Sequence, residues 1–124
     1  MEERAFSVDV ATFYVSEQSD PASNRFAFGY SITIRNIGTV AATLRSRHWI
    51  ITNGNGERQD VRGPGVVGQQ PHLAPGEQFE YTSGAMLATE IGSMYGSYEF
   101  EDAAGQRFCV PIPAFTLAVP NVLH

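Results

Sequence analysis

The stretch from Arg25 to Arg35, RFAFGYSITIR, has the clearest two-residue periodicity in the chain. Small residues alternate in it with five large ones: Phe26, Phe28, Tyr30, Ile32 and Ile34. Successive side chains of a β-strand point to opposite faces. The pattern therefore predicts a strand that turns its large side chains toward a core.

Other segments with strand character lie before and after this stretch, at residues 5–15, 43–52, 58–62, 78–83, 94–101 and 106–112. In the segment 43–52 the inward face is ambiguous, because Leu44 and Ile50 are out of phase with Trp49. Only residues 84–92 could form a helix, and that stretch is short for one. We expect five further residues to join the core: Tyr98, Phe100, Phe108, Val110 and Ile112.

Turn signals between these segments fix the expected fold class. The run Asn53-Gly54-Asn55-Gly56 predicts a β-hairpin with a type I′ turn, whose two central residues need positive φ. About seven short strands with frequent turns predict an all-β fold, an antiparallel β-sandwich of the fibronectin type III or immunoglobulin-like class. A small barrel is the alternative.

Composition limits the possible functions. The 124 residues predict one domain spanning residues 1–124, and the net charge of −5 argues against nucleic-acid binding. The single cysteine, Cys109, excludes an internal disulfide, and we expect it to pack as a small core hydrophobe. We find no signal peptide and no apolar run of membrane-spanning length, which predicts a cytoplasmic protein without membrane insertion.

The arginines are unevenly distributed along the chain. All eight basic residues are arginine, and six of them lie between residues 25 and 62. One interpretation is that they lie on solvated strand faces. The other is that they attract anions on one side of the protein, because the guanidinium fork matches the geometry of phosphate and carboxylate.

The segment from Val61 to Gly76, VRGPGVVGQQPHLAPG, is the densest in glycine and proline. Residues 63–68 spell GxGxxG, but two prolines follow, so no dinucleotide-binding helix can begin there. The loop is either structural or an anion-binding nest of backbone amides. For a nest we expect the ligand-binding residues to be Gly63, Gly65, Val66, Val67 and Gly68, with Arg62, Arg47 and Arg45 nearby.

Residues suited to catalysis are scattered. No serine lies in a nucleophile elbow, and His48, His72 and His124 lack the spacing of a metal site. Cys109 has no activating partner in the sequence. We therefore predict a protein that is not an enzyme and holds no metal or cofactor. A phosphate-ester hydrolase is the weakest of the hypotheses.

Several motifs together resemble the ApaG family: YSITI at 30–34, RHWIIT at 47–52, GPGVVG at 63–68, PHLAPG at 71–76, YTSG at 81–84 and MYG at 94–96. The resemblance covers nearly the whole chain. It implies a fibronectin III-like sandwich without enzymatic activity, acting as a protein–protein interaction module with an unidentified partner. It also implies an indirect link to cobalt resistance and magnesium efflux. The alternative is a module that binds a small anion, pyrophosphate or nucleotide through the glycine loop.

Overall fold

A computed structural model describes residues 3–120 of the chain. It contains strands and two short 3-10 turns, Ser16–Gln18 and Pro21–Ser23, but no α-helix among these residues. The strands are β1 (Phe6–Tyr14), β2 (Phe26–Asn36), β3 (Ala42–Asn53), β4 (Arg58–Pro64), β5 (His72–Leu73), β6 (Gln78–Leu87), β7 (Ile91–Asp102) and β8 (Arg107–Ala118). None of the described segments is a helix of the length and apolarity that a membrane crossing needs.

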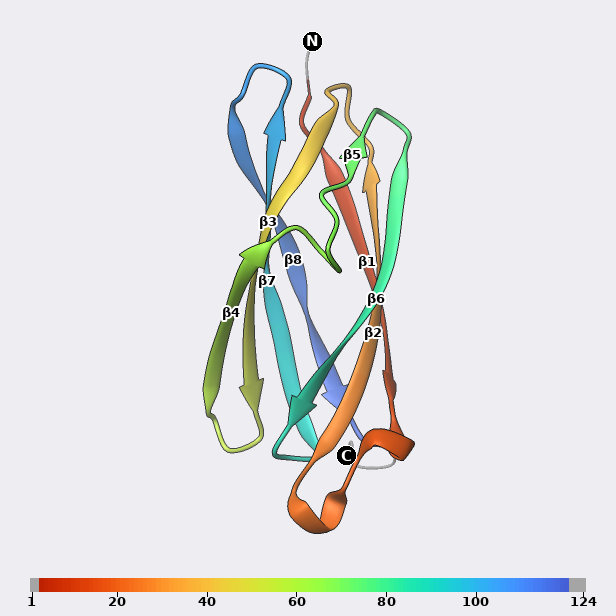
Figure 1. The fold of residues 1–124 in the computed structure, drawn as a ribbon, viewed down its shortest axis with the longest axis vertical. Coiled ribbons are helices and arrows are strands. Elements are labelled where there is room, and N and C mark those ends of the chain that lie inside the picture. The colour runs from red at the N-terminus through yellow and green to blue at the C-terminus, as the bar shows by residue number, and fades with distance from the viewer. Residues whose placement is uncertain (1–2, 121–124) are drawn as a thin grey trace.

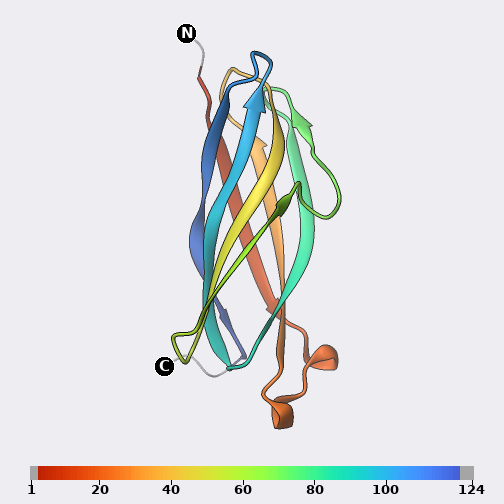
Figure 2. The same cartoon turned by 60° about the vertical axis from the view of Figure 1, so that its left-hand side comes forward.

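The strands form two antiparallel sheets that pack face to face (Figures 1 and 2). One sheet has the order β1-β2-β6, and the other has the order β4-β3-β7-β8, with β5 also paired to β3. This confirms the predicted sandwich, and the alternative of a single closed barrel is wrong. The start of β1 and the end of β8 lie at opposite ends of the long axis (Figure 1).

The large side chains of β2 fill the space between the sheets, as its periodicity predicts. Ile32 and Ile34 are fully buried, and Tyr98 and Phe100 of the second sheet are fully buried in the same core cluster. Nine of the ten residues predicted for the core are buried: Phe26, Phe28, Tyr30, Ile32, Ile34, Tyr98, Phe100, Val110 and Ile112. The tenth, Phe108, is only half-buried and stacks on Phe100.

A β-bulge explains the ambiguous face of β3. The pairing of β3 with β7 shifts between Leu44 and Ser46, so Arg45 is the extra residue. An extra residue reverses the inward face of the strand beyond it. Leu44 and Trp49 are therefore both buried, although their separation of five residues would place them on opposite faces of a regular strand.

Three other expectations are corrected. In the turn after β3 only Gly56 has positive φ, so the hairpin forms without a type I′ turn. The stretch 84–92 is not helical, because β6 continues to Leu87 and β7 begins at Ile91. Cys109 is exposed rather than buried, because its side chain lies on the outer face of β8, opposite Glu99.

The two long sides of the sandwich differ. On one side β1 contacts β8 and closes the gap between the sheets. The other side, which we call the open side, is bordered by the outer strands β4 and β6 (Figure 2). The glycine-rich loop leaves the end of β4 on this side before the chain returns to pair with β3 as β5.

Candidate functional site

The glycine-rich loop begins where β4 ends, and its first glycine makes room for an arginine. Gly63 pairs with Arg47 of β3. A Cβ atom built on Gly63 would lie 3.0 Å from Nη2 and 3.1 Å from Nη1 of Arg47. The guanidinium group therefore lies flat against the backbone at Gly63. A side chain at position 63 would push it away.

The other two glycines of the motif shape a tight turn. Val66 and Gln69 exchange two backbone hydrogen bonds of 2.8 Å across Val67 and Gly68. Both of these central residues have positive φ, 43° at Val67 and 79° at Gly68, as in a type I′ turn. Gly65 also has positive φ, and a Cβ atom there would lie on the Gln69 carbonyl. The glycine spacing thus has a structural explanation that requires no phosphate.

Val67 is the least expected residue in this turn. A β-branched side chain rarely adopts positive φ, because its Cβ substituents crowd the backbone. Val67 is nevertheless held there by the Val66–Gln69 bridge, and half of its surface is exposed. Strained conformations of this kind are concentrated at functional sites. The turn therefore presents an exposed apolar side chain at a fixed position.

Arg47 is the charged centre of this region. Its Nη1 atom donates to the carbonyl oxygens of Pro64 and Gly65, at 3.0 and 2.8 Å. None of the ion pairs among residues 3–120 includes Arg47. The guanidinium is thus held in position by neutral carbonyl groups, and its positive charge has no carboxylate partner in the described part of the chain.

Arg47 lines a pocket of about 350 Å³ on the open side, which we call the arginine pocket. The loop contributes Val66, Val67 and Gly68 to it, and the strands contribute Tyr30, Arg47, Trp49, Tyr81 and Ser83. Aromatic walls around a cation lower the local dielectric and strengthen its attraction to an anion. This pocket is suited to an anionic group.

Two tyrosines join the sheets beneath this pocket. The hydroxyl groups of Tyr81 on β6 and Tyr98 on β7 are 2.6 Å apart and hydrogen-bonded. Burial raises the pKa of Tyr81 to about 12 and also raises the pKa of Tyr98. Both hydroxyls are therefore neutral at physiological pH and donate or accept hydrogen bonds without serving as bases.

The remaining residues predicted for the anion site lie apart from this pocket or are already engaged. Arg62 pairs with His48 on the outer face of the sheet and is exposed. Arg45 binds Glu101 at 2.8 Å and Gln70 at 3.0 Å. The amides of Gly65 and Val66 donate to the carbonyls of Arg45 and Gln69. Of the predicted group, the structure brings Arg47, Val66, Val67 and Gly68 together around one pocket.

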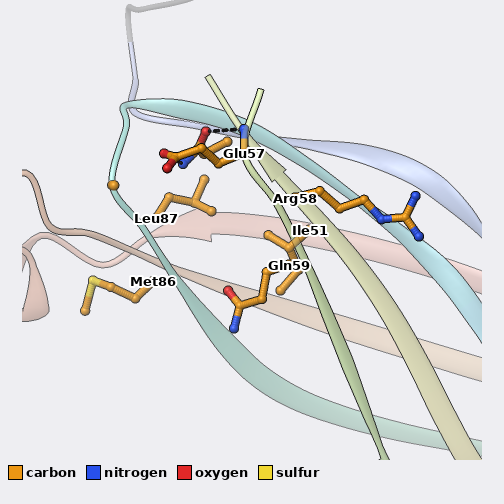
Figure 3. A pocket seen from close by; sticks show the side chains of 8 residues that line it. Ile51, Glu57, Arg58, Gln59, Met86 and Leu87 are labelled. Atoms are coloured by element: carbon orange, nitrogen blue, oxygen red, sulfur yellow. Dashed lines mark hydrogen bonds between the residues drawn. The ribbon is translucent and has the colours of Figure 1, made fainter. Parts of the chain in front are cut away.

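A second pocket on the open side was not found from the sequence. It encloses about 200 Å³ between the end of β6 and the β3–β4 hairpin, and we call it the leucine pocket. Ile51, Gln59 and Leu87 point into it, whereas Arg58 and Met86 extend away at its rim (Figure 3). No local signal in the sequence indicated this pocket, because its lining comes from strands that are distant along the chain.

No metal centre is formed by residues 3–120, since no three His, Cys, Asp or Glu side chains gather there. His48 instead contacts Asp60 at 3.0 Å, and Asp60 also binds Arg58 at 2.9 Å. These hydrogen bonds lower the pKa of Asp60. His72 bonds to Thr43, and His124 lies outside the described residues.

Comparison with known proteins gives concordant results. Residues 16–102 match the family model described as the ApaG domain. The chain is 58% identical to Protein ApaG of Azoarcus sp. (strain BH72) over 117 residues, covering 94% of this chain and 92% of that protein. It is 56% identical to Protein ApaG of Thiobacillus denitrificans, covering 95% and 93%. A crystal structure named for the ApaA protein of Bordetella pertussis superposes with a TM-score of 0.92 at 51% identity, covering 96% of this chain and 97% of that one.

Proposed function

The chain belongs to the ApaG family, and from this premise we propose that it is a non-enzymatic module that binds a partner protein on the open side of its sandwich. One observation carries the proposal: the guanidinium of Arg47 faces a pocket and has no carboxylate partner among the described residues. Partial burial of a cation without a counter-charge costs free energy, because the cation loses contact with water. Binding of a partner that supplies a carboxylate is therefore favoured.

Arg47 has the capacity to bind such a group. A guanidinium carries five N–H donors, and the two bonds to Pro64 and Gly65 use Nη1 alone. The donors on Nε and Nη2 have no protein partner among residues 3–120. They can accept a carboxylate in the bidentate arrangement that arginine favours. An acidic side chain of a partner protein matches this requirement.

The chemistry of the arginine pocket favours binding over turnover. Its two hydroxyl-bearing aromatic residues, Tyr30 and Tyr81, are buried. The raised pKa of Tyr81 keeps its proton in place at neutral pH, which makes it a poor general base. Ser83 also lines the pocket, but no histidine or carboxylate of residues 3–120 does. A binding role is therefore the simplest function that these residues support.

A titration with N-acetylglutamate tests this proposal. The signals of isotope-labelled protein should change first at the Nε of Arg47 and at the amides of Val67 and Ser83. Arg47→Gln should abolish these changes. Arg62→Gln should leave them intact, since Arg62 lies on the outer face of the same sheet. Shifts that survive Arg47→Gln, or that need Arg62, would contradict the proposal.

A second candidate, binding of pyrophosphate or a nucleotide, is favoured by the position of the turn. Val67 and Gly68 line the pocket beside Arg47, and their amides have no partner in the described chain. Because the amides of Gly65 and Val66 are already bonded, Arg47 would be the main anchor. Pyrophosphate should then bind in the micromolar to millimolar range and more weakly as salt rises. If the Val67 and Gly68 signals stay still at millimolar pyrophosphate, this candidate fails.

The link to cobalt resistance and magnesium efflux is part of the same proposal, as an indirect effect. Hard cations need several oxygen ligands gathered together. The described residues hold no such group, so the protein would act on cation transport through its partner. A strain lacking the gene should regain cobalt tolerance with the wild-type protein and with Arg62→Gln. Equal rescue by Arg47→Gln would argue against an effect that passes through this pocket.

A further inference from the structure

We propose that the open side binds an extended peptide segment of the partner, which adds to the sheet as a fourth strand along β6. The segment carries an acidic residue that meets Arg47 and, four positions before it, an apolar residue that enters the leucine pocket. This inference rests on the proposed function and names the form of the partner. It draws on the edges of the sheets, the positions of the two pockets and the charge of Arg47.

The edge of β6 differs from the edges of β1, β4 and β8. Proteins usually protect an outer strand with charges, prolines or a covering element. In this protein β8 carries Pro111 and Pro113, β4 carries three charged residues, and β1 lies against β8. The stretch of β6 from Tyr81 to Leu87 contains neither a charge nor a proline, and among the strands of residues 3–120 it pairs only with β2. Its outward backbone groups therefore offer a template for one more strand.

The two pockets lie along the same face of this strand. Tyr81, Ser83, Ala85 and Leu87 are buried or half-buried and alternate with exposed residues, so they face the interior. Ser83 lines the arginine pocket and Leu87 lines the leucine pocket. Ala85 lies between them on the same face and packs against the core. A strand added beside β6 would place its inward side chains over both pockets.

Strand geometry fixes the spacing and order of the partner's side chains. Ser83 and Leu87 are four residues apart, which is about 13 Å at roughly 3.3 Å per residue. Side chains four apart on an extended peptide span the same distance and point to the same face. Antiparallel pairing is the more stable arrangement. The residue opposite Leu87 then comes first, and the residue opposite Ser83, near Arg47, follows four positions later.

A second copy of the chain does not satisfy this site. Pairing of two β6 strands would bring Tyr81, Ser83, Ala85 and Leu87 of one copy beside those of the other. Every one of these inward side chains is uncharged. Arg47 would remain without a counter-charge. A separate peptide with an acidic residue is therefore the occupant that the charge of the pocket selects.

A designed peptide tests the inference directly. The probe is a blocked, labelled peptide of about nine residues in a threonine and serine background, with leucine followed by glutamate four positions later. Fluorescence anisotropy should detect binding of this peptide. The affinity should fall about tenfold when glutamine replaces the glutamate. Moving the glutamate to three positions after the leucine should weaken binding similarly, because it turns one side chain outward. Arg47→Gln should lower affinity, and Arg62→Gln should not.

Backbone pairing needs its own measurement. Peptide amides of an added strand point alternately toward and away from β6. N-methylation of one alternating set should abolish binding, and methylation of the other set should be tolerated. Hydrogen exchange should slow at alternate amides between Tyr81 and Leu87 when the peptide binds. If the affinity depends neither on which amides are methylated nor on the spacing of leucine and glutamate, the proposal of an added strand is refuted.

The outcomes separate this inference from the proposed function. Peptides that need glutamate and Arg47 but tolerate any spacing would refute the added strand and leave the binding function intact. Loss of all dependence on Arg47 would refute both. The protein could instead dimerise as its concentration rises, with the dimer blocking the peptide and the charge in Met86→Lys abolishing the dimer. That result would make a second copy the occupant and overturn the inference.

Discussion

Replacing Gly63 with alanine tests whether the first glycine of the loop motif exists to accommodate Arg47. The new Cβ would lie 3.0–3.2 Å from three guanidinium atoms, so Arg47 must move by a few tenths of an ångström. That movement stretches its bonds to Pro64 and Gly65, now 3.0 and 2.8 Å. Weakening both should cost about 1–2 kcal/mol of stability.

An opposing effect reduces the net change. Gly63 lies in a strand and its φ is not positive, so alanine suits its backbone. Alanine at such a position stabilises a protein by about 0.5–1 kcal/mol, because it restricts the unfolded chain. In the wild-type background we therefore expect Gly63→Ala to destabilise the protein by at most about 1.5 kcal/mol.

The informative comparison is made in the absence of the guanidinium. In an Arg47→Ala background the substitution at Gly63 meets no obstacle and should stabilise the protein by about 0.5–1 kcal/mol. Urea unfolding of the four proteins gives the coupling free energy, expected at about 1–2 kcal/mol. If Gly63→Ala has the same effect with and without Arg47, the two residues are not coupled and this account of the motif is refuted.

Three other predictions follow from buried or strained residues. Ile32→Ala should lower the free energy of unfolding by about 2–5 kcal/mol, because Ile32 is fully buried. A loss below about 1 kcal/mol in urea unfolding would contradict its core position. Val67→Asn should raise the midpoint of thermal unfolding, because positive φ costs asparagine about 1 kcal/mol less than it costs valine. A lower midpoint would count against strain at this turn. The free energy of unfolding should fall as pH rises from about 10 to about 12, because the unfolded chain ionises its tyrosines while folded Tyr81 and Tyr98 stay protonated. Urea unfolding across this range should show a shallower decline in Tyr98→Phe, and an unchanged slope would exclude Tyr98 as a source of the dependence.

The fold could be predicted from the sequence wherever the chain follows a regular period. In β2 the alternation from Phe26 to Ile34 identifies both the strand and its buried face. The same reasoning cannot settle β3, because the bulge at Arg45 changes the inward face within one strand. Nothing local in the sequence marks that residue as extra, since its position depends on pairing with β7.

The candidate site was partly predictable for a similar reason. The glycine spacing identified the loop, and the arginine pattern identified Arg47 as a cross-strand neighbour. Neither pattern could show that the loop presents the carbonyls of Pro64 and Gly65 to that arginine, because this depends on the turn at Val67 and Gly68. The leucine pocket arises from strands distant in the sequence and had no local signal.

The placement of the outer strands bears on how the domain would respond to force. Strand β1 begins at one end of the long axis, and β8 ends at the other (Figure 1). A stretching load applied between these points runs nearly along both strands. The hydrogen bonds joining β1 to β2 and β8 to β7 would then be sheared together instead of opening in succession. A tandem array of this domain should therefore unfold in discrete, high-force steps under a single-molecule tether.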